Sequence, residues 1–461
     1  MKAECWKKKQ SRFTIMGLGD SITEGSDDFA SYLFPLWEKL MSAGYEFDFI
    51  GPRESKCRIG TLKCGGYSGH TVEFLDSKVD SLYRLYPADI ILLHAGHNHF
   101  VEEKPVSRMV ASYRSIIAKI WKINPRAVIL LAKVIPSGKL PKYSYIPELN
   151  KQIERLVKEI NSARLICVDQ ASDFDWHSET VADKVHPNRK GAERIASVWM
   201  TALKKLLDPA PNAFHPEIIH YKGLPDNDSL AIHLFRPDRK YGKGRRPAIV
   251  YFFGGGWTYG TPLQFYRECA YFSSKGYVAI AADYRIHYLH HSSIRESFED
   301  AKDVIRFIRE YAEKLQVDAD RIAVAGASAG GHLAASLGTI GTTDSIKADY
   351  LPNLLLLYYP VVDIRQERYR NLLPQGRFED ISPICHVCAN TPPTLFLLGM
   401  EDPIVPIETA KEFQRNLLQK GVPCELDLFE RAGHPIFQYR RPQTKEYWEI
   451  LGMTERWLDK L

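Results

Sequence analysis

The sequence predicts two α/β domains that follow one another along the chain. Its 461 residues exceed the usual size of one domain. In both halves, short apolar runs alternate with longer helical stretches, a pattern typical of parallel sheets with helices on both faces. A stretch with three prolines and no periodicity, residues 207–217, separates the halves. We therefore predict domains at residues 1–207 and 218–461, joined by a linker at residues 208–217.

The composition is that of a globular protein, with 45% hydrophobic and 25% charged residues. The net charge of +5 is spread along the chain without a basic tract, so we expect no nucleic-acid partner. No apolar run is long enough to span a membrane, so we expect no membrane partner either. The first residues lack the apolar core and cleavage site of a signal peptide, which indicates a cytoplasmic protein or one whose leader was removed. The composition leaves the oligomeric state open.

The eight cysteines are too few and too scattered for a disulfide framework. We expect free thiols. The alternative is a local disulfide between Cys57 and Cys64, which lie in a predicted loop. Cys385 and Cys388 have no second pair that would complete a zinc site. No metal and no cofactor are predicted.

The predicted strands of the first half are short, apolar and separated by helical stretches. The clearest helical pattern, residues 145–162, follows the fourth strand. The strands are expected at residues 13–19, 46–51, 89–96, 127–136 and 164–169.

Ser21 directly follows the first strand, in "GLGDSITEG", where a parallel sheet exposes residues at the carboxyl ends of its strands. A serine nucleophile needs a base, an acid that orients the base, and donors for the oxyanion. Asp183 and His186, three residues apart, are suited to act as acid and base. The backbone amide of Gly69 and the side chain of Asn98 are suited to hold an oxyanion.

Four blocks of the first half occur in the order found in SGNH (GDSL) hydrolases: Gly-Asp-Ser at 19–21, Gly69, Asn98 and Asp183-x-x-His186. Residues 12–207 resemble this family, which implies a flavodoxin-like α/β/α sandwich. The resemblance also implies that Ser21 is the nucleophile, His186 the base and Asp183 its orienting acid. Gly69 and Asn98 would then belong to the oxyanion hole.

Three histidines, His94, His97 and His99, lie at the end of the third strand and raise the alternative of a metal site. No carboxylate or further ligand pattern completes such a site, so we expect none. His99 stands where the family usually has an aspartate. We expect this departure to affect the loop and the substrate preference more than catalysis.

The second half opens with a predicted β-hairpin at residues 218–235, where Asp-Asn-Asp supplies the turn. Apolar runs separated by helical stretches then continue to residue 399. The predicted strands lie within residues 231–237, 247–257, 277–285, 321–331, 351–363 and 393–399.

The stretch "DRIAVAGASAGGHLAASL" predicts a strand, a tight turn around Ser328 and a helix, which is the context of a nucleophile elbow. Glycines at 326 and 330 relieve crowding around the serine. Three earlier glycines, residues 254–256, follow a strand and can bring backbone amides close to a substrate oxygen.

Downstream of this turn, Asp402 follows a strand and His434 follows Asp402, which is the order of serine, acid and histidine in α/β-hydrolases. Glu401 is a competing acid, but Asp402 fits the spacing from the preceding glycine better. Residues 214–461 resemble the α/β-hydrolase superfamily, and most closely its esterase and lipase branch with an HGGG-type loop.

The resemblance implies that Ser328, Asp402 and His434 are the catalytic residues. It places the backbone amides of the oxyanion hole at Gly255, Gly256 and Ala329. Phe253 stands where the loop usually has its first histidine, and we expect this change to alter the shape of the pocket more than the mechanism.

Two serine sites on one chain indicate a substrate that bears several esters, because the second cleavage then benefits from proximity. The two domains together resemble acetyl xylan esterases. This resemblance implies hydrolysis of O-acetyl esters on xylan or xylo-oligosaccharides, with an acetylated polysaccharide as the partner. Trp257 and Tyr259, beside the oxyanion loop, either stack on a sugar or close the core.

Three alternatives stay open. The second domain could remove feruloyl or other aryl groups while the first removes acetyl groups. The substrate could be a different acetylated sugar, such as sialic acid or pectin. Finally, one domain could serve as a binding module or scaffold, and the departure at His99 makes the first domain the candidate for that role.

Overall fold

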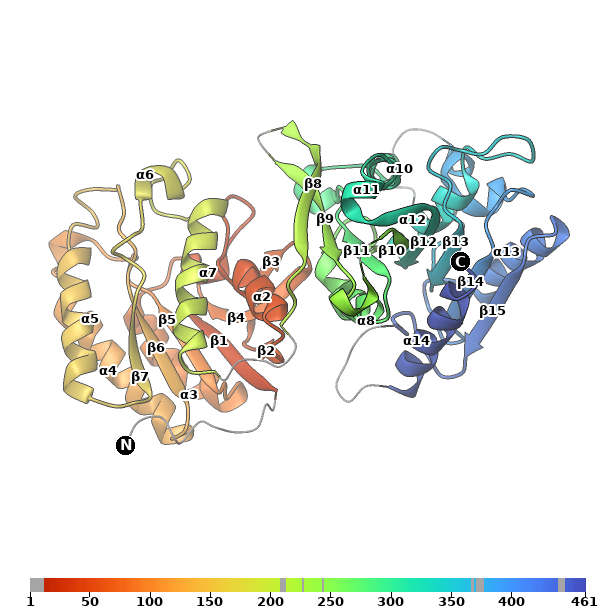
Figure 1. Cartoon of the computed structure of the whole chain (residues 1–461). Coiled ribbons are helices and arrows are strands. Elements are labelled where there is room, and N and C mark those ends of the chain that lie inside the picture. Colours follow the sequence, from red (N-terminus) through yellow and green to blue (C-terminus); the bar gives the residue numbers. More distant parts are fainter. Residues whose placement is uncertain are drawn as a thin grey trace. The chain divides into compact units, whose positions relative to one another are not determined.

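The computed structural model describes residues 12–207, 213–225, 228–242, 244–365, 369, 377–437 and 444–461. The chain divides into two compact units, Met1–Phe214 and His215–Leu461, each built on its own sheet (Figure 1). Residues 208–212 of the predicted linker lie outside the described residues, as do residues 226 and 227 in the predicted hairpin turn. Each unit has an α/β fold, as the sequence predicts.

The first unit contains a seven-stranded sheet. In spatial order β3, β4, β1, β5, β6 and β7 lie side by side, and β2 also pairs with β1. All pairs are parallel except β3 with β4, which form an antiparallel hairpin. The strands are β1 (Phe13–Gly19), β2 (Phe47–Phe49), β3 (Arg53–Cys57), β4 (Gly60–Gly66), β5 (Ile90–His94), β6 (Val128–Lys133) and β7 (Leu165–Asp169).

Helices cover both faces of this sheet. Successive residues of a strand point to opposite faces, so each strand contributes side chains to two cores. Met16 and Ile91 pack in a core with α3, α4 and α5, whereas Ile15 and Ile90 pack in a second core with α2 and α7. The unit is therefore a three-layered α/β/α sandwich. Its helices are α1 (Ser21–Glu24), α2 (Leu33–Ser42), α3 (Val72–Leu85), η1 (Val101–Glu103), α4 (Val106–Ile123), α5 (Ile146–Ile160), α6 (Trp176–Glu179) and α7 (Arg189–Lys204).

The predicted loop around Cys57 and Cys64 is instead the β3–β4 hairpin. Cys64 pairs with Arg53 and Cys57 with Gly60, so the two cysteines do not face one another. Both are buried free thiols, and burial raises the pKa of each to about 11. The hairpin escaped prediction because polar side chains at the exposed positions of both strands interrupt any apolar run.

The second unit contains an eight-stranded sheet in the order β15, β14, β13, β12, β10, β11, β9 and β8. β9 is antiparallel to both of its neighbours, and the remaining pairs are parallel. The predicted opening hairpin is formed by β8 and β9, but β15 was not predicted. The strands are β8 (Glu217–Gly223), β9 (Ser229–Phe235), β10 (Arg246–Phe252), β11 (Val278–Ala282), β12 (Val317–Ala327), β13 (Leu354–Tyr358), β14 (Thr394–Gly399) and β15 (Cys424–Phe429).

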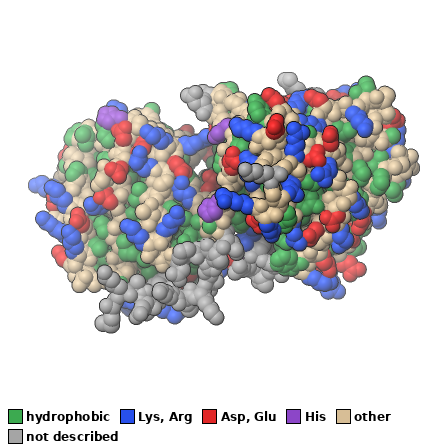
Figure 2. Space-filling view, viewed as in Figure 1, with side chains coloured by type: hydrophobic (Ala, Val, Ile, Leu, Met, Phe, Trp, Pro, Cys, Tyr) green, Lys and Arg blue, Asp and Glu red, His purple; other side chains and the backbone are tan. Residues whose placement is uncertain are grey.

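The helices of the second unit connect these strands. They are α8 (Tyr266–Ser274), α9 (His287–His290), α10 (Ile294–Glu310), α11 (Ala312–Leu315), α12 (Ala329–Thr339), α13 (Ile407–Gln419) and α14 (Lys445–Leu458), with 3-10 turns η3 (Arg239–Tyr241), η4 (Pro262–Phe265), η6 (Phe378–Ile381) and η7 (Pro383–His386). Within the described ranges, no helix is long and apolar enough to cross a membrane. On the face seen in Figure 2, basic and acidic side chains are interspersed over each unit.

A buried carboxylate on α10 links this helix to β8, the first strand of the second unit. Asp300, on α10, is fully buried and accepts hydrogen bonds from Lys222 on β8 and from Arg285, which follows β11. Asp303, one turn further along α10, also contacts Lys222 but is 37% exposed. The two aspartates thus share a cation but differ in burial.

We predict that Asp300→Asn destabilises the second domain by about 3–5 kcal/mol, because it leaves two partly buried cations short of a partner. Asp303→Asn is the matched control and should cost about 0–1 kcal/mol, as expected of an exposed ion pair. Calorimetric unfolding of both variants measures the difference. Equal losses in the two variants would contradict the role assigned to Asp300.

Candidate active sites

In each sheet, strands that follow one central strand in the sequence lie on both sides of it. In the first unit β4 lies on one side of β1 and β5 on the other, and in the second unit β11 and β12 flank β10 in the same way. Loops that leave the carboxyl ends of such neighbouring strands diverge and open a crevice, which is where α/β sheets bind ligands. Both predicted serine sites lie at these points.

In the first unit, Ser21 is the first residue of the short helix α1 and is separated from the end of β1 by Asp20 alone. The buried side chain of Asp20 caps this helix by accepting a hydrogen bond from the amide of Ile22 at 3.1 Å, and also accepts one from Gly96, after β5, at 3.2 Å. Gly19 has no space for a side chain, because a Cβ would lie 2.2 Å from the carbonyl oxygen of His94. The serine is therefore held between two adjacent strand ends.

The structure brings Ser21 together with the predicted base and acid. The Oγ of Ser21 lies 2.8 Å from Nε2 of His186, and Nδ1 of His186 lies 2.5 Å from Oδ2 of Asp183. The other oxygen of Asp183 accepts hydrogen bonds from the amides of Val185 and His186. Burial raises the pKa of Asp183, but the hydrogen bonds from His186 and from the two amides outweigh it, so the pKa lies below its ordinary value.

A hydrogen bond joins the two loops that carry Gly69 and Asn98, the predicted oxyanion residues of this unit. Nδ2 of Asn98 donates to the carbonyl oxygen of His70 at 2.8 Å, next to Gly69. An amide nitrogen carries two hydrogens, so this bond leaves one for a substrate oxygen. Gly69 has a φ of +76°, a conformation that favours glycine.

His99, which replaces the usual aspartate, supports the loop that carries Asn98. Its buried imidazole lies between two carboxylates, 2.9 Å from Oε2 of Glu73 on α3 and 3.0 Å from Oε2 of Glu103 on η1. Arg108 contacts the same two carboxylates. The loop is thus tied to the helix that follows Gly69, although by an imidazole rather than by a carboxylate.

The other two histidines face the core. His94 and His97 are buried, and burial lowers the pKa of each to about 4, so both imidazoles are neutral near pH 7. Each lies within hydrogen-bonding distance of the backbone of Ile135. Across the described part of the chain, no group of three or more histidine, cysteine, aspartate or glutamate side chains is placed to hold a metal ion.

In the second unit, Ser328 lies in a tight turn between β12 and α12, with a φ of +53°. This strained conformation is typical of a nucleophile elbow. Its flanking glycines are required for close packing. A Cβ on Gly326 would lie 2.2 Å from the carbonyl oxygen of Gly330, and one on Gly330 would lie 2.0 Å from that of Phe252.

Ser328 also lies within a hydrogen-bonded chain. Its Oγ is 2.8 Å from Nε2 of His434, and Nδ1 of His434 is 2.7 Å from Oδ2 of Asp402. Oδ1 of Asp402 accepts hydrogen bonds from the amides of Ile404 and Val405. Asp402, rather than the exposed Glu401, is therefore the acid that contacts the histidine.

The glycine loop after β10 lies beside this serine. A Cβ on Gly254 would be 3.3 Å from that of Ser328, and the amide of Gly254 donates to Oε1 of Gln264 at 2.6 Å. Since that amide is occupied, Gly255 and Gly256 are the glycines of the loop that remain suited to an oxyanion, and Ala329 begins α12 directly after the serine.

Phe253, which stands where the loop usually has its first histidine, is an interior residue. It is fully buried and stacks on Tyr284, with ring centroids 4.1 Å apart. Its ring therefore belongs to the packed interior at the start of the glycine loop.

Comparisons with known proteins assign each half of the chain to a hydrolase family. The GDSL-like Lipase/Acylhydrolase family matches residues 18–194, and the BD-FAE family matches residues 233–355. A solved structure of Thermogutta terrifontis esterase 2, phosphonylated by sarin, is 33% identical with a TM-score of 0.50, over 55% of this chain and 98% of that chain. The chain joins a GDSL-like acylhydrolase domain to an α/β-hydrolase esterase domain.

Two curated relatives resemble this chain over only a part of their own length. The acylamino-acid-releasing enzyme of Arabidopsis thaliana is 30% identical over 319 residues, which is 64% of this chain and 39% of that protein. Endo-1,4-beta-xylanase B of Butyrivibrio fibrisolvens is 29% identical over 158 residues, which is 31% of this chain and 25% of that protein. The chain spans less than half of the length of each of these relatives.

The two aromatic residues after the glycine loop of the esterase domain differ in exposure. Trp257 is only 3% exposed and packs edge-on against His332 and Tyr369. Tyr259 is 39% exposed and lies 5.6 Å from the ring of Tyr288. Trp257 therefore closes the core, whereas Tyr259 presents a ring to solvent.

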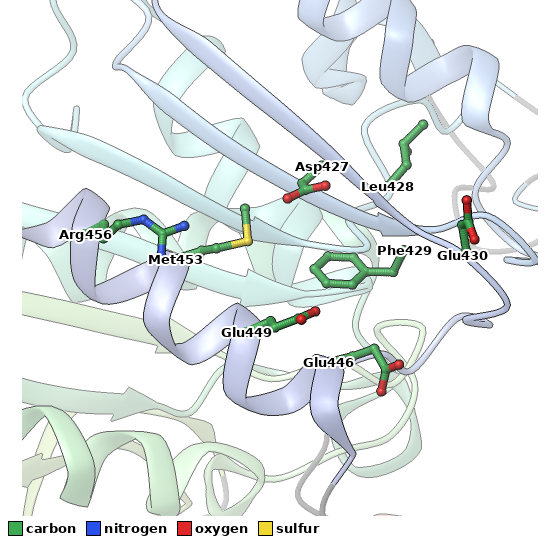
Figure 3. A pocket seen from close by; sticks show the side chains of 8 residues that line it. All are labelled: Asp427, Leu428, Phe429, Glu430, Glu446, Glu449, Met453 and Arg456. Carbon is green, nitrogen blue, oxygen red and sulfur yellow. The ribbon is translucent and has the colours of Figure 1, made fainter.

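A separate cavity of about 500 Å³ lies between β15 and α14 of the esterase domain (Figure 3). Half of the residues that line it are acidic, and the others are Leu428, Phe429, Met453 and Arg456. None of the residues that line it belongs to either serine site, and nothing in the described residues identifies a ligand for it.

Sequence reasoning missed the aromatic rings that contact His186 and His434, the two predicted bases. Phe29 stacks on His186 in the GDSL-like domain, and Tyr359 packs edge-on against His434 in the esterase domain. Neither ring belongs to a recognisable motif. Tyr359 lies within the predicted strand at residues 351–363, but Phe29 had no signal beyond an apolar residue in a polar loop.

We predict that Gly330→Ala slows the reaction of Ser328 with a phosphonate probe by about a hundredfold, because the added methyl group displaces the elbow from β10. Mass spectrometry of the labelled peptide measures the rate. Gly338→Ala, in the same helix, is the control, since its Cβ would meet the flexible side chain of Leu355. Similar rates for wild type and Gly330→Ala would contradict this account of the elbow.

Proposed function

We propose that the chain is a carbohydrate esterase with two serine active sites, which hydrolyse O-acetyl esters on xylan or xylo-oligosaccharides through acyl-enzyme intermediates. The observation that carries the proposal is the hydrogen-bonded order of serine, histidine and aspartate in each domain, at 2.8 and 2.5 Å in one and at 2.8 and 2.7 Å in the other. Three groups in this order are the machinery of acyl transfer to serine.

Both sites would follow the same steps. The histidine takes the proton of the serine hydroxyl while the oxygen attacks the ester carbonyl, and the aspartate stabilises the resulting imidazolium. Backbone amides hold the oxyanion, with help from Asn98 in the GDSL-like domain. The histidine then protonates the departing sugar oxygen, which leaves as a hydroxyl group. A water molecule, deprotonated by the same histidine, finally attacks the acetyl-enzyme, and acetate leaves as the histidine returns the proton to the serine oxygen.

The xylan substrate is supported by two observations. One relative carries the name of an endo-1,4-beta-xylanase, although it covers only 31% of this chain. In addition, Tyr259 exposes a ring in the loop that follows the oxyanion glycines, where a sugar ring can stack. A polymer with several acetyl groups also gives two tethered esterases an advantage, since binding at one site raises the local concentration of ester at the other.

We predict that Ser21→Ala and Ser328→Ala each retain part of the acetate release from acetylated xylan, whereas the double variant loses at least about 10³-fold. Enzymatic assay of free acetate, with product analysis by NMR, measures both the rate and the ester position. A single variant that is as inactive as the double variant would show that the other domain is a binding module or has a different substrate.

We predict that Tyr259→Ala, in a Ser21→Ala background, raises the KM for acetylated xylo-oligosaccharides by about 5- to 10-fold, the amount expected for one lost stacking contact. The effect on p-nitrophenyl acetate, which has no sugar, should be smaller. Tyr288→Ala tests the neighbouring ring in the same assay. Equal effects on both substrates would argue against a sugar-stacking role.

A second candidate function is cleavage of acylated amino acids, because one relative is named an acylamino-acid-releasing enzyme. N-acetyl-alanine p-nitroanilide, an amide substrate, distinguishes it from ester hydrolysis. Feruloylated oligosaccharides and acetylated pectin or sialic acid, assayed with the same single variants, distinguish the other ester substrates.

A further inference from the structure

Phe29 makes an unusually close contact with the base of the GDSL-like site. The rings of Phe29 and His186 are nearly parallel, with an angle of 16° between their planes and centroids 3.9 Å apart. Phe29 is half-buried, and among the described residues it belongs to neither hydrophobic core of its domain. Its ring therefore packs against the site and not against the protein interior.

The loop that carries Phe29 is fastened to both sides of the serine site. It begins after α1, where the amide of Gly25 donates to the carbonyl oxygen of Ser21 at 2.8 Å. Near its other end, the amide of Ala30 donates to the carbonyl oxygen of Pro187 at 3.1 Å. Pro187 directly follows His186. The loop thus connects the nucleophile segment to the base segment and places Phe29 over the imidazole.

The acid and base of this site are more exposed than those of the other. The side chains of His186 and Asp183 are 22% and 37% exposed, whereas those of His434 and Asp402 are 13% and 0% exposed. Water competes for the hydrogen bonds of an exposed pair and so weakens the hold of Asp183 on the imidazole. A ring stacked on one face of the imidazole limits this effect.

We propose that Phe29 is a positioning residue of the GDSL-like site. Its ring holds the imidazole of His186 in the plane that directs Nε2 to Ser21 and Nδ1 to Asp183, and it keeps water from one face of the imidazole. This inference rests on the proposed function, since it assigns Phe29 a part in the activation of Ser21. The contact acts through His186, so Phe29 touches no reacting atom.

The test uses the full chain with Ser328→Ala, so that only Ser21 reports. Phe29→Leu fills similar space but cannot stack, whereas Phe29→Tyr retains the ring. We expect Phe29→Leu to lower kcat for p-nitrophenyl acetate by about 3- to 10-fold with little change in KM. Phe29→Tyr should retain most of the kcat of the parent protein. The rate at which a phosphonate probe labels Ser21 should change in the same order, whatever the natural substrate is.

Phe34→Leu is the matched control, because Phe34 is another partly buried phenylalanine of this domain that stacks on Trp37, away from the serine site. It should leave kcat and labelling unchanged. Equal rates for the parent protein, Phe29→Leu and Phe29→Tyr would overturn the positioning role while leaving the serine site intact. Absence of Ser21 labelling in the parent protein would instead overturn the proposed function of this domain, and the inference with it.

Discussion

The reversal of strand order beside one central strand is the constraint on which both sites depend. In each sheet the chain adds a strand on one side of β1 or β10 and then crosses to the other side. The two loops that leave this point diverge, so one can present a serine while the other presents amides. In the first domain Asp20 joins the two loops directly, and in the second the glycines at 326 and 330 allow helix, turn and strand to touch.

The two domains reach the same order of serine, histidine and aspartate by different local means. Asp183 and His186 are three residues apart on one loop, and the amide of His186 itself donates to Asp183. Asp402 and His434 lie on separate loops and are held together by burial of the aspartate and by amides next to it. The acid and base on one short loop are more exposed to solvent than the acid and base on two separate loops. The exposed first histidine has a ring stacked on its face, whereas Tyr359 meets the more enclosed second histidine edge-on.

Much of this arrangement could be predicted from the sequence, and the failures have physical reasons. Buried parallel strands are continuous apolar runs, so β5, β10 and β13 were predictable, as were the residues brought together around each serine. The β3–β4 hairpin and the edge strand β15 were missed because exposed positions interrupt their apolar pattern. The stacking of Phe29 and the burial of Trp257 were not predictable, since they depend on contacts between residues far apart in the chain.

The glycines of the two sites are of two kinds, and this distinction bears on how the family can vary. At Gly330 and Gly255 the neighbouring backbone occupies the volume that any side chain would need. At Gly69 nothing lies within 4 Å of a built Cβ, and only the left-handed φ of +76° disfavours a side chain. Asparagine or aspartate adopts that conformation at modest cost. Gly69 is therefore open to replacement during divergence of this loop, whereas Gly326 and Gly330, which flank Ser328, are fixed by volume.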